Sequence, residues 1–253
     1  MTRLSLIIPA YNEVARIEET VRAALAYFDG KGIATQIIVA ADGTDGTREV
    51  VRSLAKQRPG IEVIGKPERR GKGCGVRDGV RISTGDVIGF IDADNKTPIS
   101  EYDKVEPLLS DGCDVVIGSR GLRTSRIEQA QPLYRRLGSR GFGLFMHTCV
   151  GLDNIIDTQC GFKFFRGDVA RELFRLQQID GYMFDVEILY LANQLGYSIG
   201  QVPVRWRDDG DSRLQLVAGN IRNVRDILSL RWRHRSVAAT APAEAAERQS
   251  SAS

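Results

Sequence analysis

The sequence predicts an α/β protein built on a mostly parallel, Rossmann-like β-sheet flanked by helices. Short apolar runs alternate with amphipathic segments through the first 120 residues, the order expected of strands joined by crossover helices. The 253 residues are 42% hydrophobic and 26% charged, which suffices for a large domain with a real core. Polar and glycine-rich motifs follow several apolar runs, at the strand ends where such sheets bind ligands.

Each element expected in the first half follows from a change in hydrophobic period. The expected strands are apolar runs of four to six residues: 4–8, 36–41, 61–64, 86–91 and 114–117. The segments between them carry helical spacing of apolar residues: 13–28 (with Asn12 as N-cap), a helix through 48–52, and 74–83. Asparagine is a favoured N-cap residue.

After residue 120 the regular alternation stops. The remaining expected elements are read from local periodicity: helices at 131–152, 184–195 and 214–233, and strands at 160–165 and 197–206. From residue 236 onward the chain consists mainly of Ala, Thr, Pro, Glu, Gln and Ser, too few apolar side chains for a core. We therefore expect one domain over 1–235, with halves 1–120 and 121–235, and a disordered tail over 236–253.

Composition excludes several classes of protein. The net charge of +3 does not indicate a nucleic-acid partner, and the arginines show no aromatic stacking platform between them. The four cysteines lie far apart without a C-x-x-C pair, so we expect reduced thiols in a cytoplasmic protein, not zinc or disulfides. No apolar run approaches the ~18 residues of a spanning helix, so any contact with a membrane would be peripheral.

Asp92 and Asp94 directly follow a buried strand, separated only by Ala93. In extended backbone, residues two apart point the same way, so the two carboxylates face one point and repel each other. A divalent cation removes this repulsion, and hard oxygen ligands suit Mg²⁺ or Mn²⁺. The pair therefore predicts a metal site, the alternative being a solvated turn in which Asp92 caps the next helix.

Residues 69–75, RRGKGCG, form a basic, glycine-rich loop that leads into a helix. Glycines let backbone N–H groups approach a phosphate, and the helix N-terminus adds partial positive charge. The loop lacks the spacing of a Walker A motif, and no G-x-G-x-x-G follows the first strand, which argues against a dinucleotide oxidoreductase. It predicts phosphate binding, unless it is only a flexible turn.

The loop at residues 42–47, DGTDGT, follows the second strand. It is compatible with a plain turn in which Thr44 or Asp45 caps a helix. An acid at this strand end is equally suited to accept hydrogen bonds from a ribose or a base.

Several of these segments together resemble inverting family 2 glycosyltransferases with a GT-A fold. The broader resemblance rests on IPAYNE at 8–13, on the loops at 42–47 and 69–73, and on the DAD motif. Further segments resemble the dolichyl-phosphate β-glucosyltransferases in particular: DTQCGFKFF at 157–165, FDVEILY at 184–190, GSR at 118–120, Trp206, and DSRL at 211–214. The resemblance spans about residues 4–230 and implies transfer of glucose from UDP-glucose to a polyprenyl phosphate.

The resemblance also implies roles for particular residues. Those implied to hold the uridine are Pro9, Tyr11, Glu13 and Asp42. Lys72 would lie near the base or diphosphate, and Asp92 and Asp94 at the metal and diphosphate. The family's second loop usually reads DDGSTDGT, whereas this chain is shorter or lacks one acid, so either Asp42 or Asp45 is the base contact.

The acceptor side is predicted from charge. A lipid monophosphate carries close to two negative charges, and arginine binds phosphate in bidentate fashion. Arg135 and Ser139 are four apart on one helical face, and related transferases place an Arg and a Ser in this way. With Arg120 they form the predicted acceptor-phosphate site, and Arg207 or Arg213 is expected to close over the diphosphate.

A phosphate acceptor changes the expected chemistry. A sugar hydroxyl needs a general base, whereas a phosphate monoester (pKa about 6 for its second ionisation) is already ionised and attacks the anomeric carbon directly. We expect no essential base, with the metal and basic loop stabilising the leaving UDP. Asp185 completes the catalytic candidates with Asp92 and Asp94, and we expect Asp185 and Glu187 to orient groups or line the acceptor site.

The last expected helix, 214–233, combines an apolar stripe with several arginines and a terminal Trp232. Such a helix suits an anionic membrane surface, or else packs on another helix or subunit. We expect a cytoplasmic enzyme, peripheral on the inner face of the cell membrane, with no oligomeric state specified.

Within the enzyme class, the alternatives are GDP-mannose as donor or a soluble acceptor. The alternative from another class is a non-catalytic nucleotide-sugar binding module.

Overall fold

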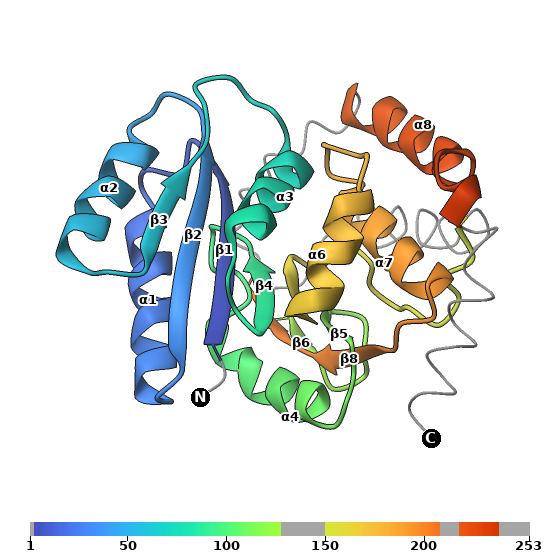
Figure 1. The fold of residues 1–253 in the computed structure, drawn as a ribbon, viewed down its shortest axis with the longest axis horizontal. Helices are drawn as coiled ribbons and strands as arrows, with labels where there is room; N and C mark the ends of the chain where they lie inside the picture. Colours follow the sequence, from blue (N-terminus) through green and yellow to red (C-terminus); the bar gives the residue numbers. More distant parts are fainter. Residues whose placement is uncertain (1–2, 128–149, 208–217, 238–253) are drawn as a thin grey trace.

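The computed structural model describes residues 3–127, 150–207 and 218–237. A seven-stranded sheet with the order β3-β2-β1-β4-β7-β5-β8 forms its centre (Figure 1). Its strands, in chain order, are β1 (Arg3–Tyr11), β2 (Ala34–Asp42), β3 (Ile61–Ile64), β4 (Val87–Ile91), β5 (Val115–Ser119), β7 (Phe162–Arg166) and β8 (Ile199–Pro203). Only β7 is antiparallel to its neighbours, β4 and β5, among these strands. The predicted mostly parallel α/β sheet is confirmed.

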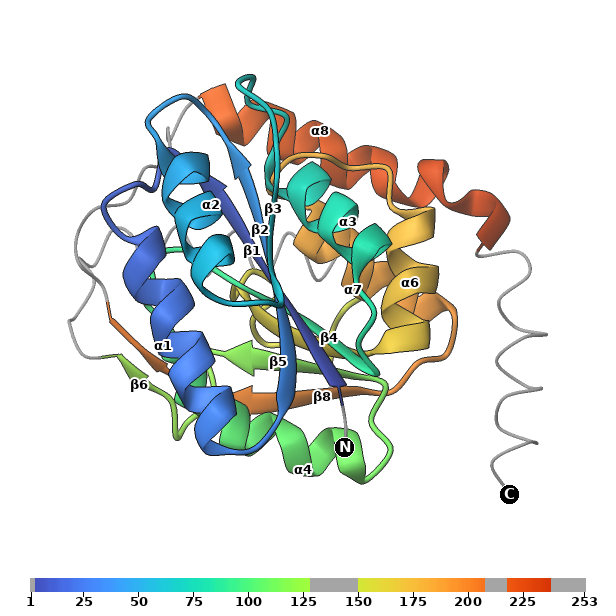
Figure 2. The ribbon, with the colours of Figure 1, turned by 60° about the vertical axis from the view of Figure 1, so that its left-hand side comes forward.

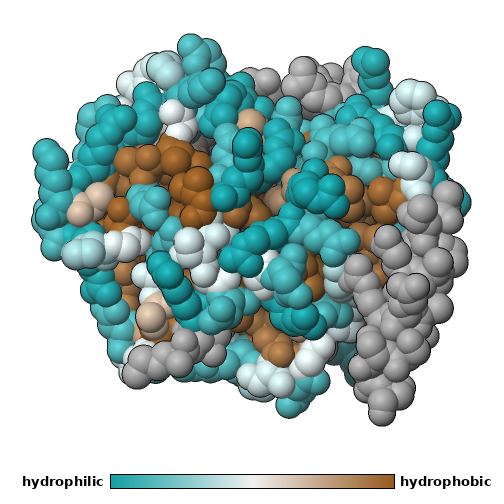
Figure 3. Space-filling model, in the orientation of Figure 1, coloured by the Kyte–Doolittle hydropathy of each residue, from teal (hydrophilic) through white to brown (hydrophobic). Residues whose placement is uncertain are grey.

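Helices cover both faces of the sheet, so the domain has three layers (Figure 2). They are α1 (Ile17–Gly30), α2 (Thr47–Gln57), α3 (Lys72–Ile82), the 3₁₀ helix η1 (Ile99–Lys104), α4 (Val105–Ser110), α6 (Gly167–Leu176), α7 (Phe184–Gln194) and α8 (Ala218–Arg233). The core with α1, α2 and η1 lies on one face, and the core with α3, α6, α7 and α8 on the other. The outer surface seen in Figure 3 is largely hydrophilic, with hydrophobic areas between the hydrophilic residues.

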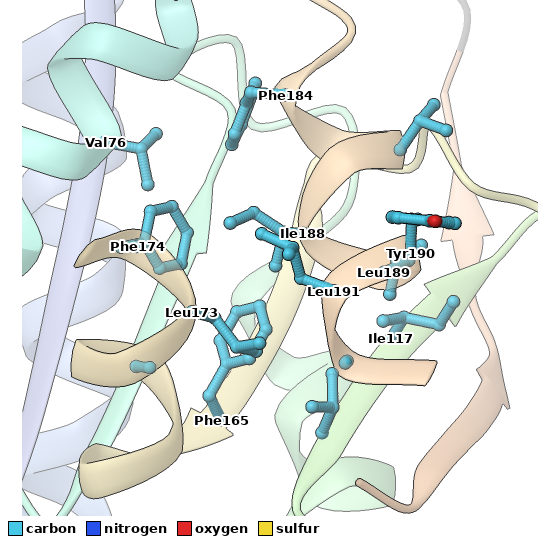
Figure 4. Packing of buried hydrophobic residues seen from close by; sticks show 14 of the residues in the cluster. Val76, Ile117, Phe165, Leu173, Phe174, Phe184, Ile188, Leu189, Tyr190 and Leu191 are labelled. Atoms are coloured by element: carbon cyan, nitrogen blue, oxygen red, sulfur yellow. The ribbon is translucent and has the colours of Figure 1, made fainter. Parts of the chain in front are cut away.

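The core on the α3–α6–α7 face is rich in aromatic side chains. Phe165 from β7, Phe174 from α6 and Phe184 from α7 lie together with aliphatic residues of α7 (Figure 4). Burying one such side chain contributes about 1.5–3 kcal/mol. Because residues alternate along a strand, Phe162 and Phe164 face the other core, and Lys163 belongs with Phe165 on the α7 side.

The first helix differs from its prediction. It begins at Ile17 rather than residue 13, and Arg16, not Asn12, precedes it as N-cap. Asn12 has a positive φ of 54°, and its side-chain oxygen accepts a hydrogen bond from the Thr44 N–H at 3.1 Å. The predicted N-cap is therefore wrong, because Asn12 joins the loops after β1 and β2 instead of starting the helix.

Other elements were missed or merged. No helix was predicted at η1, α4 or α6. η1 and α4 have only six residues each, whereas α6 has ten and a buried apolar face that was overlooked in the sequence. The strand expected at 197–206 is divided into β8 and β9 (Arg205–Trp206). β9 pairs with β6 (Arg126–Ile127) in a second, two-stranded sheet, because Val204 bridges the sheets through backbone bonds with Ser119 and Arg126.

Some predicted segments lie wholly or partly outside the described residues. These are residues 131–149 of the expected helix 131–152, residues 214–217 of the expected helix 214–233, and residues 238–253 of the tail. Val237, two residues beyond the expected domain boundary, is partly buried against the core.

Candidate active site

The carboxyl ends of β1, β2 and β4 lie at one edge of the sheet, because the three strands are parallel. Tyr11 at the end of β1 is in register with Asp42 at the end of β2. Asp92 follows the last residue of β4, and Lys72 is the first residue of α3. The strand ends thus bring together most of the site residues that were predicted from the sequence.

Asp92 is partly exposed and lies at the centre of this group. Its side chain is 45% exposed, and its Oδ1 lies 2.8 Å from Lys72 Nζ. Behind it, the Asp92 N–H donates a hydrogen bond to the Gly161 carbonyl oxygen at 3.0 Å. A Cβ on Gly161 would stand 2.0 Å from Asp92 Oδ2, so any larger residue there would displace the Asp92 carboxylate. This contact explains the glycine of the DTQCG motif, which is far from the DAD motif in sequence and adjacent to it in space.

Asp94 lies deeper than Asp92. Burial, and then the negative charge of Asp92, raise the pKa of Asp94. Lys96 Nζ is 3.7 Å from its Oδ2, and the Lys96 N–H donates to Oδ1 at 3.2 Å. The charge of Asp92 thus disfavours ionisation of Asp94, but Asp94 lies in a turn and not in the extended backbone from which a shared direction of the two carboxylates was expected.

The donor set suits a hard divalent cation. The ammonium groups of Lys72 and Lys96 partly balance the charges of Asp92 and Asp94, respectively. One or two carboxylates completed by substrate phosphates are a usual Mg²⁺ arrangement. Over the described ranges, no three His, Cys, Asp or Glu side chains form a metal-binding group. Asp92 and Asp94 are the residues that fit.

Lys72 is positioned by close packing of its loop. Gly71 has a φ of +110°, and a Cβ there would be 2.2 Å from the Asp180 carbonyl oxygen, so glycine is needed for the approach to the segment before α7. Burial by itself would lower the pKa of Lys72, but the carboxylates of Asp92 and Asp185 raise it. Lys72 is therefore a permanent cation at the strand ends.

Asp42 holds the same loop. Its buried carboxylate accepts hydrogen bonds from the Lys66 N–H at 3.1 Å and the Arg70 N–H at 2.9 Å, and it pairs with the Arg70 guanidinium at 3.2 Å. Arg70 also binds Asp78 at 2.6 Å. In this structure Asp42 fixes the loop that carries Lys72.

Asp45, the other candidate base contact, bonds the first residue of α2, whose N-cap is Gly46. Its carboxylate accepts hydrogen bonds from the Thr47 N–H at 3.0 Å and the Val14 N–H at 2.9 Å. Burial opposes ionisation, but these bonds and that from the Thr47 hydroxyl lower the pKa of Asp45. Both acids of the loop therefore have structural bonds in this conformation.

The other predicted uridine contacts line the end of β1. Tyr11 is 39% exposed, and the Arg69 guanidinium carbon lies 4.6 Å from its ring centroid. Pro9 is partly buried earlier in the same strand, in register with Ala40. The Glu13 N–H donates to the Thr47 hydroxyl at 2.9 Å. Tyr11 and Arg69 thus offer a flat, exposed surface beside the cluster.

Asp185, at the start of α7, is buried between two lysines. Its Oδ1 is 2.5 Å from Lys163 Nζ, and its Oδ2 is 3.7 Å from Lys72 Nζ. Lys163 was not among the predicted site residues. The sequence feature that could have identified it is a lysine placed between phenylalanines in an expected strand, at a position that strand alternation assigns to the core.

Glu187 has a structural role in α7. It accepts hydrogen bonds from the Gln178 N–H at 2.9 Å and the Ile179 N–H at 2.8 Å. Its Oε1 also lies 2.7 Å from Nε2 of the buried His234, just after α8. Glu187 therefore ties α7, the preceding segment and the end of α8 together.

The predicted acceptor residues are only partly described. Arg120 forms a bidentate pair with Asp157, at 2.7 Å through Nε and 2.9 Å through Nη2, and its guanidinium carbon lies 5.5 Å from the Trp206 ring centroid. The Arg207 N–H donates to the Lys96 carbonyl oxygen at 3.0 Å, which joins the end of β9 to the DAD loop. Arg135, Ser139 and Arg213 lie outside the described residues.

Curated relatives share most of the chain. A dolichyl-phosphate β-glucosyltransferase of Dictyostelium discoideum is 34% identical over 245 residues, 91% of this chain and 74% of the relative. The Drosophila melanogaster protein of that name is 35% identical, covering 83% and 69%. The human protein of that name is 30% identical, covering 92% and 76%.

Solved structures show the same fold. Glucosyl-3-phosphoglycerate synthase from Mycobacterium tuberculosis, in complex with UDP, superposes with a TM-score of 0.66 at 23% identity, covering 90% of this chain and 80% of that one. A complex of the same synthase with Mn²⁺ and UDP-glucose gives 0.66 at 22% identity, covering 91% and 79%. The family model for glycosyl transferase family 2 matches residues 5–174. The chain therefore belongs to glycosyl transferase family 2, with the GT-A fold, and is a relative of the dolichyl-phosphate β-glucosyltransferases.

Proposed function

We propose that this glycosyltransferase moves glucose from UDP-glucose to a polyprenyl phosphate, with inversion at the anomeric carbon. The observation that carries the proposal is the cluster of Lys72, Asp92 and Asp94 at the carboxyl ends of the parallel strands. It supplies carboxylates for a divalent cation and a cation for a diphosphate. The curated relatives named above support glucose and a dolichyl-type acceptor as the substrates.

The donor would lie across the strand ends. Tyr11 and its stacked Arg69 would receive the uracil ring, because aromatic and guanidinium planes stack on bases. Pro9, Glu13 and Asp42 would complete the uridine site, as the family resemblance implies. Lys72 would bind the diphosphate, and Asp92 and Asp94 would hold Mg²⁺ or Mn²⁺, which when bound offsets charge on the leaving UDP.

The acceptor phosphate would act without a general base, because it is ionised at neutral pH. The surroundings of Asp185 support this assignment. Both of its oxygens face lysine ammonium groups, and its side chain is 4% exposed, so it is poorly placed to take a proton from an acceptor. We assign Asp185 to orientation of Lys72.

The lipid phosphate would be held by arginines. Arg120 is held in one orientation by Asp157 next to Trp206, and Arg207 follows the strand beside the DAD loop. We keep Arg135, Ser139 and Arg213 as predicted partners of the same phosphate. Bidentate arginines would bind a doubly charged phosphate more strongly than a neutral hydroxyl acceptor.

Helix α8 is the proposed membrane contact. Val224, Leu228 and Trp232 are 37%, 61% and 69% exposed and lie four residues apart, so they form one stripe. On the opposite side, Ile227 and Leu230 are buried in the core. Within residues 3–127, 150–207 and 218–237, no helix has the length and hydrophobicity needed to span a bilayer. We propose that the stripe rests on the anionic inner leaflet of the cell membrane.

A radiolabelled transfer assay tests the reaction. UDP-glucose, UDP-galactose, UDP-GlcNAc and GDP-mannose would each be offered with a short polyprenyl phosphate, with and without Mn²⁺ or Mg²⁺. We expect label in the lipid phase from UDP-glucose only, dependent on the divalent ion. Preferential transfer from GDP-mannose would replace the donor assignment. Transfer only to soluble sugars would refute the lipid acceptor, and UDP binding without any transfer would favour the binding module.

A further inference from the structure

We propose that Lys163 is a positioning residue for donor binding, acting through Asp185 on Lys72. This inference rests on the proposed function, because it takes UDP as the ligand of Lys72. Lys163 is completely buried, so it does not touch a substrate. Its ammonium donates to Asp185 Oδ1 at 2.5 Å and to the Cys160 carbonyl oxygen at 2.7 Å, and lies 5.4 Å from the Phe90 ring centroid.

The lysine is held in the sheet, which makes its position rigid. It stands in β7, opposite Phe90 of β4 and Ile117 of β5. Asp185 is therefore anchored from the sheet side, through a strand with hydrogen-bonded neighbours on both edges. Removing this anchor would leave a buried carboxylate that has lost its nearer cation, and an uncompensated buried charge of this kind is costly. Any other cation within reach would then be drawn toward it.

The cation within reach is Lys72. Its Nζ is 3.7 Å from Asp185 Oδ2 but only 2.8 Å from Asp92 Oδ1. Four groups of alternating charge thus run from the core to the surface: Lys163, Asp185, Lys72 and Asp92. Their side chains are 0%, 4%, 15% and 45% exposed in that order. The row contains equal numbers of positive and negative groups, and its outer members are the ones that would meet the donor.

The balance of charge among these four groups determines how readily the Lys72 ammonium can bind a diphosphate. In the native chain Asp185 divides its negative charge between two lysines, so it restrains Lys72 without fully engaging it. When Lys163 loses its charge, Asp185 keeps only Lys72 of these two lysines, and Lys72 should move inward toward it. A diphosphate would then have to compete with a buried carboxylate for the same ammonium.

Lys163→Met tests this, since methionine fills similar space without charge. We expect titration of the variant with UDP in the presence of Mn²⁺ to show affinity about tenfold weaker, the scale of coupling between contacting charged groups. The KM for UDP-glucose should rise with little change in the KM for polyprenyl phosphate. Both effects should disappear in the Asp185→Asn background, where no carboxylate remains at this position to attract Lys72.

A matched control is Lys104→Met. Lys104 also bonds a buried carboxylate, Glu101 at 2.5 Å, and a backbone carbonyl, that of Pro203 at 2.8 Å, but it takes no part in the row. We expect it to lower the melting temperature and leave UDP affinity unchanged. If Lys163→Met does not fold, Lys163→Gln, which retains a donor for the Cys160 carbonyl, replaces it with the same expectations.

The outcomes separate the two proposals. Unchanged UDP affinity in the Lys163 variant, with native affinity in the unsubstituted chain, would overturn the positioning role alone. If the Lys163 substitution weakened UDP binding by the same factor with and without Asp185→Asn, the positioning role would also be overturned. Failure of the unsubstituted chain to bind UDP would overturn the proposed function and this inference together.

Discussion

At the residue scale, the chemistry of the site depends on neighbours that lie far away in sequence. Asp92 has its backbone N–H bonded to Gly161, and Lys72 is placed by the contact of Gly71 with Asp180. The family motifs are therefore not independent pieces. DTQCG and RRGKG each contribute a glycine that lets another segment approach the predicted metal and diphosphate residues.

Asp94→Ala should abolish the metal-dependent part of turnover while the fold persists. The side chain has a raised pKa through burial and the nearby Asp92 charge, so its loss relieves repulsion as well as removing a ligand. We expect kcat with Mn²⁺ to fall by about two orders of magnitude, the scale of one lost electrostatic group in an active site. Thermal melting and steady-state rates would check this, with the exposed Asp111→Ala as control; full activity would refute the metal role.

Gly161→Ala should displace the Asp92 carboxylate, because the added Cβ would lie 2.0 Å from Oδ2. A displacement of about 1 Å at a reacting centre costs up to about 100-fold in rate, so we expect a loss of about 10- to 100-fold in kcat/KM. Gly181→Ala is the matched control, since a Cβ there meets nothing within 4 Å. Equal activity of the two variants would contradict the contact.

At the scale of elements, a buried carboxylate joins the two halves of the chain. Glu101 in η1 is 2% exposed and pairs with Lys104 at 2.5 Å and with Arg205 of β9 at 2.5 Å. Burial opposes its ionisation, but these two cations lower the pKa of Glu101 below its ordinary value. The pair to Arg205 fixes β9, and with it Trp206, against the side of the sheet near the DAD loop.

Glu101→Gln should destabilise the protein in a pH-dependent way. Because the folded pKa is lowered, the ion pair stabilises the native state above the unfolded pKa of about 4.3 and is lost as pH falls through the folded pKa. We expect the free energy of unfolding to drop by about 1–3 kcal/mol at pH 7. Urea titrations should show the difference from the native chain shrinking below about pH 4; a pH-independent difference would refute the ion pair.

At the scale of the whole molecule, α8 connects a proposed membrane surface to the catalytic core. His234, immediately after α8, is buried and bonded to Glu187 of α7, while Leu228 and Trp232 are exposed. The same helix thus packs on the core that contains α7 and presents an apolar stripe to the outside. This arrangement would orient the site toward a lipid acceptor.

The double change Leu228→Ser and Trp232→Ser should weaken membrane binding without unfolding the core. Burial of one such apolar side chain stabilises by about 1.5–3 kcal/mol. Loss of both side chains should therefore lower partitioning onto anionic liposomes by at least about tenfold. Flotation at low and high salt would measure it, since the arginines of α8 should add a salt-sensitive term. Ile82→Ser, at an exposed apolar residue of α3, is the control; flotation equal to the native chain would refute the contact.

Much of this protein was predictable from sequence because local patterns encode local structure. The alternating apolar runs determined the strands and the α/β class, and the motifs at their ends indicated the family and the metal and diphosphate candidates. The N-cap at Asn12 failed because a hydrogen bond to Thr44, a tertiary contact, holds that residue in the left-handed region. Helix α6 was missed although its sequence does carry a helical pattern, with Val169, Ala170, Leu173 and Phe174 on one buried face.

The sequence by itself determined the fold class, the order of the first strands along the chain, and Asp92, Asp94 and Lys72 as candidates. Only the tertiary structure decided that β7 enters the sheet antiparallel between β4 and β5. That placement brings Gly161 against Asp92 and Lys163 against Asp185. The physical reason is that charge pairing and close packing depend on distances across the fold, and these distances are set by strand order, which no local pattern of residues specifies.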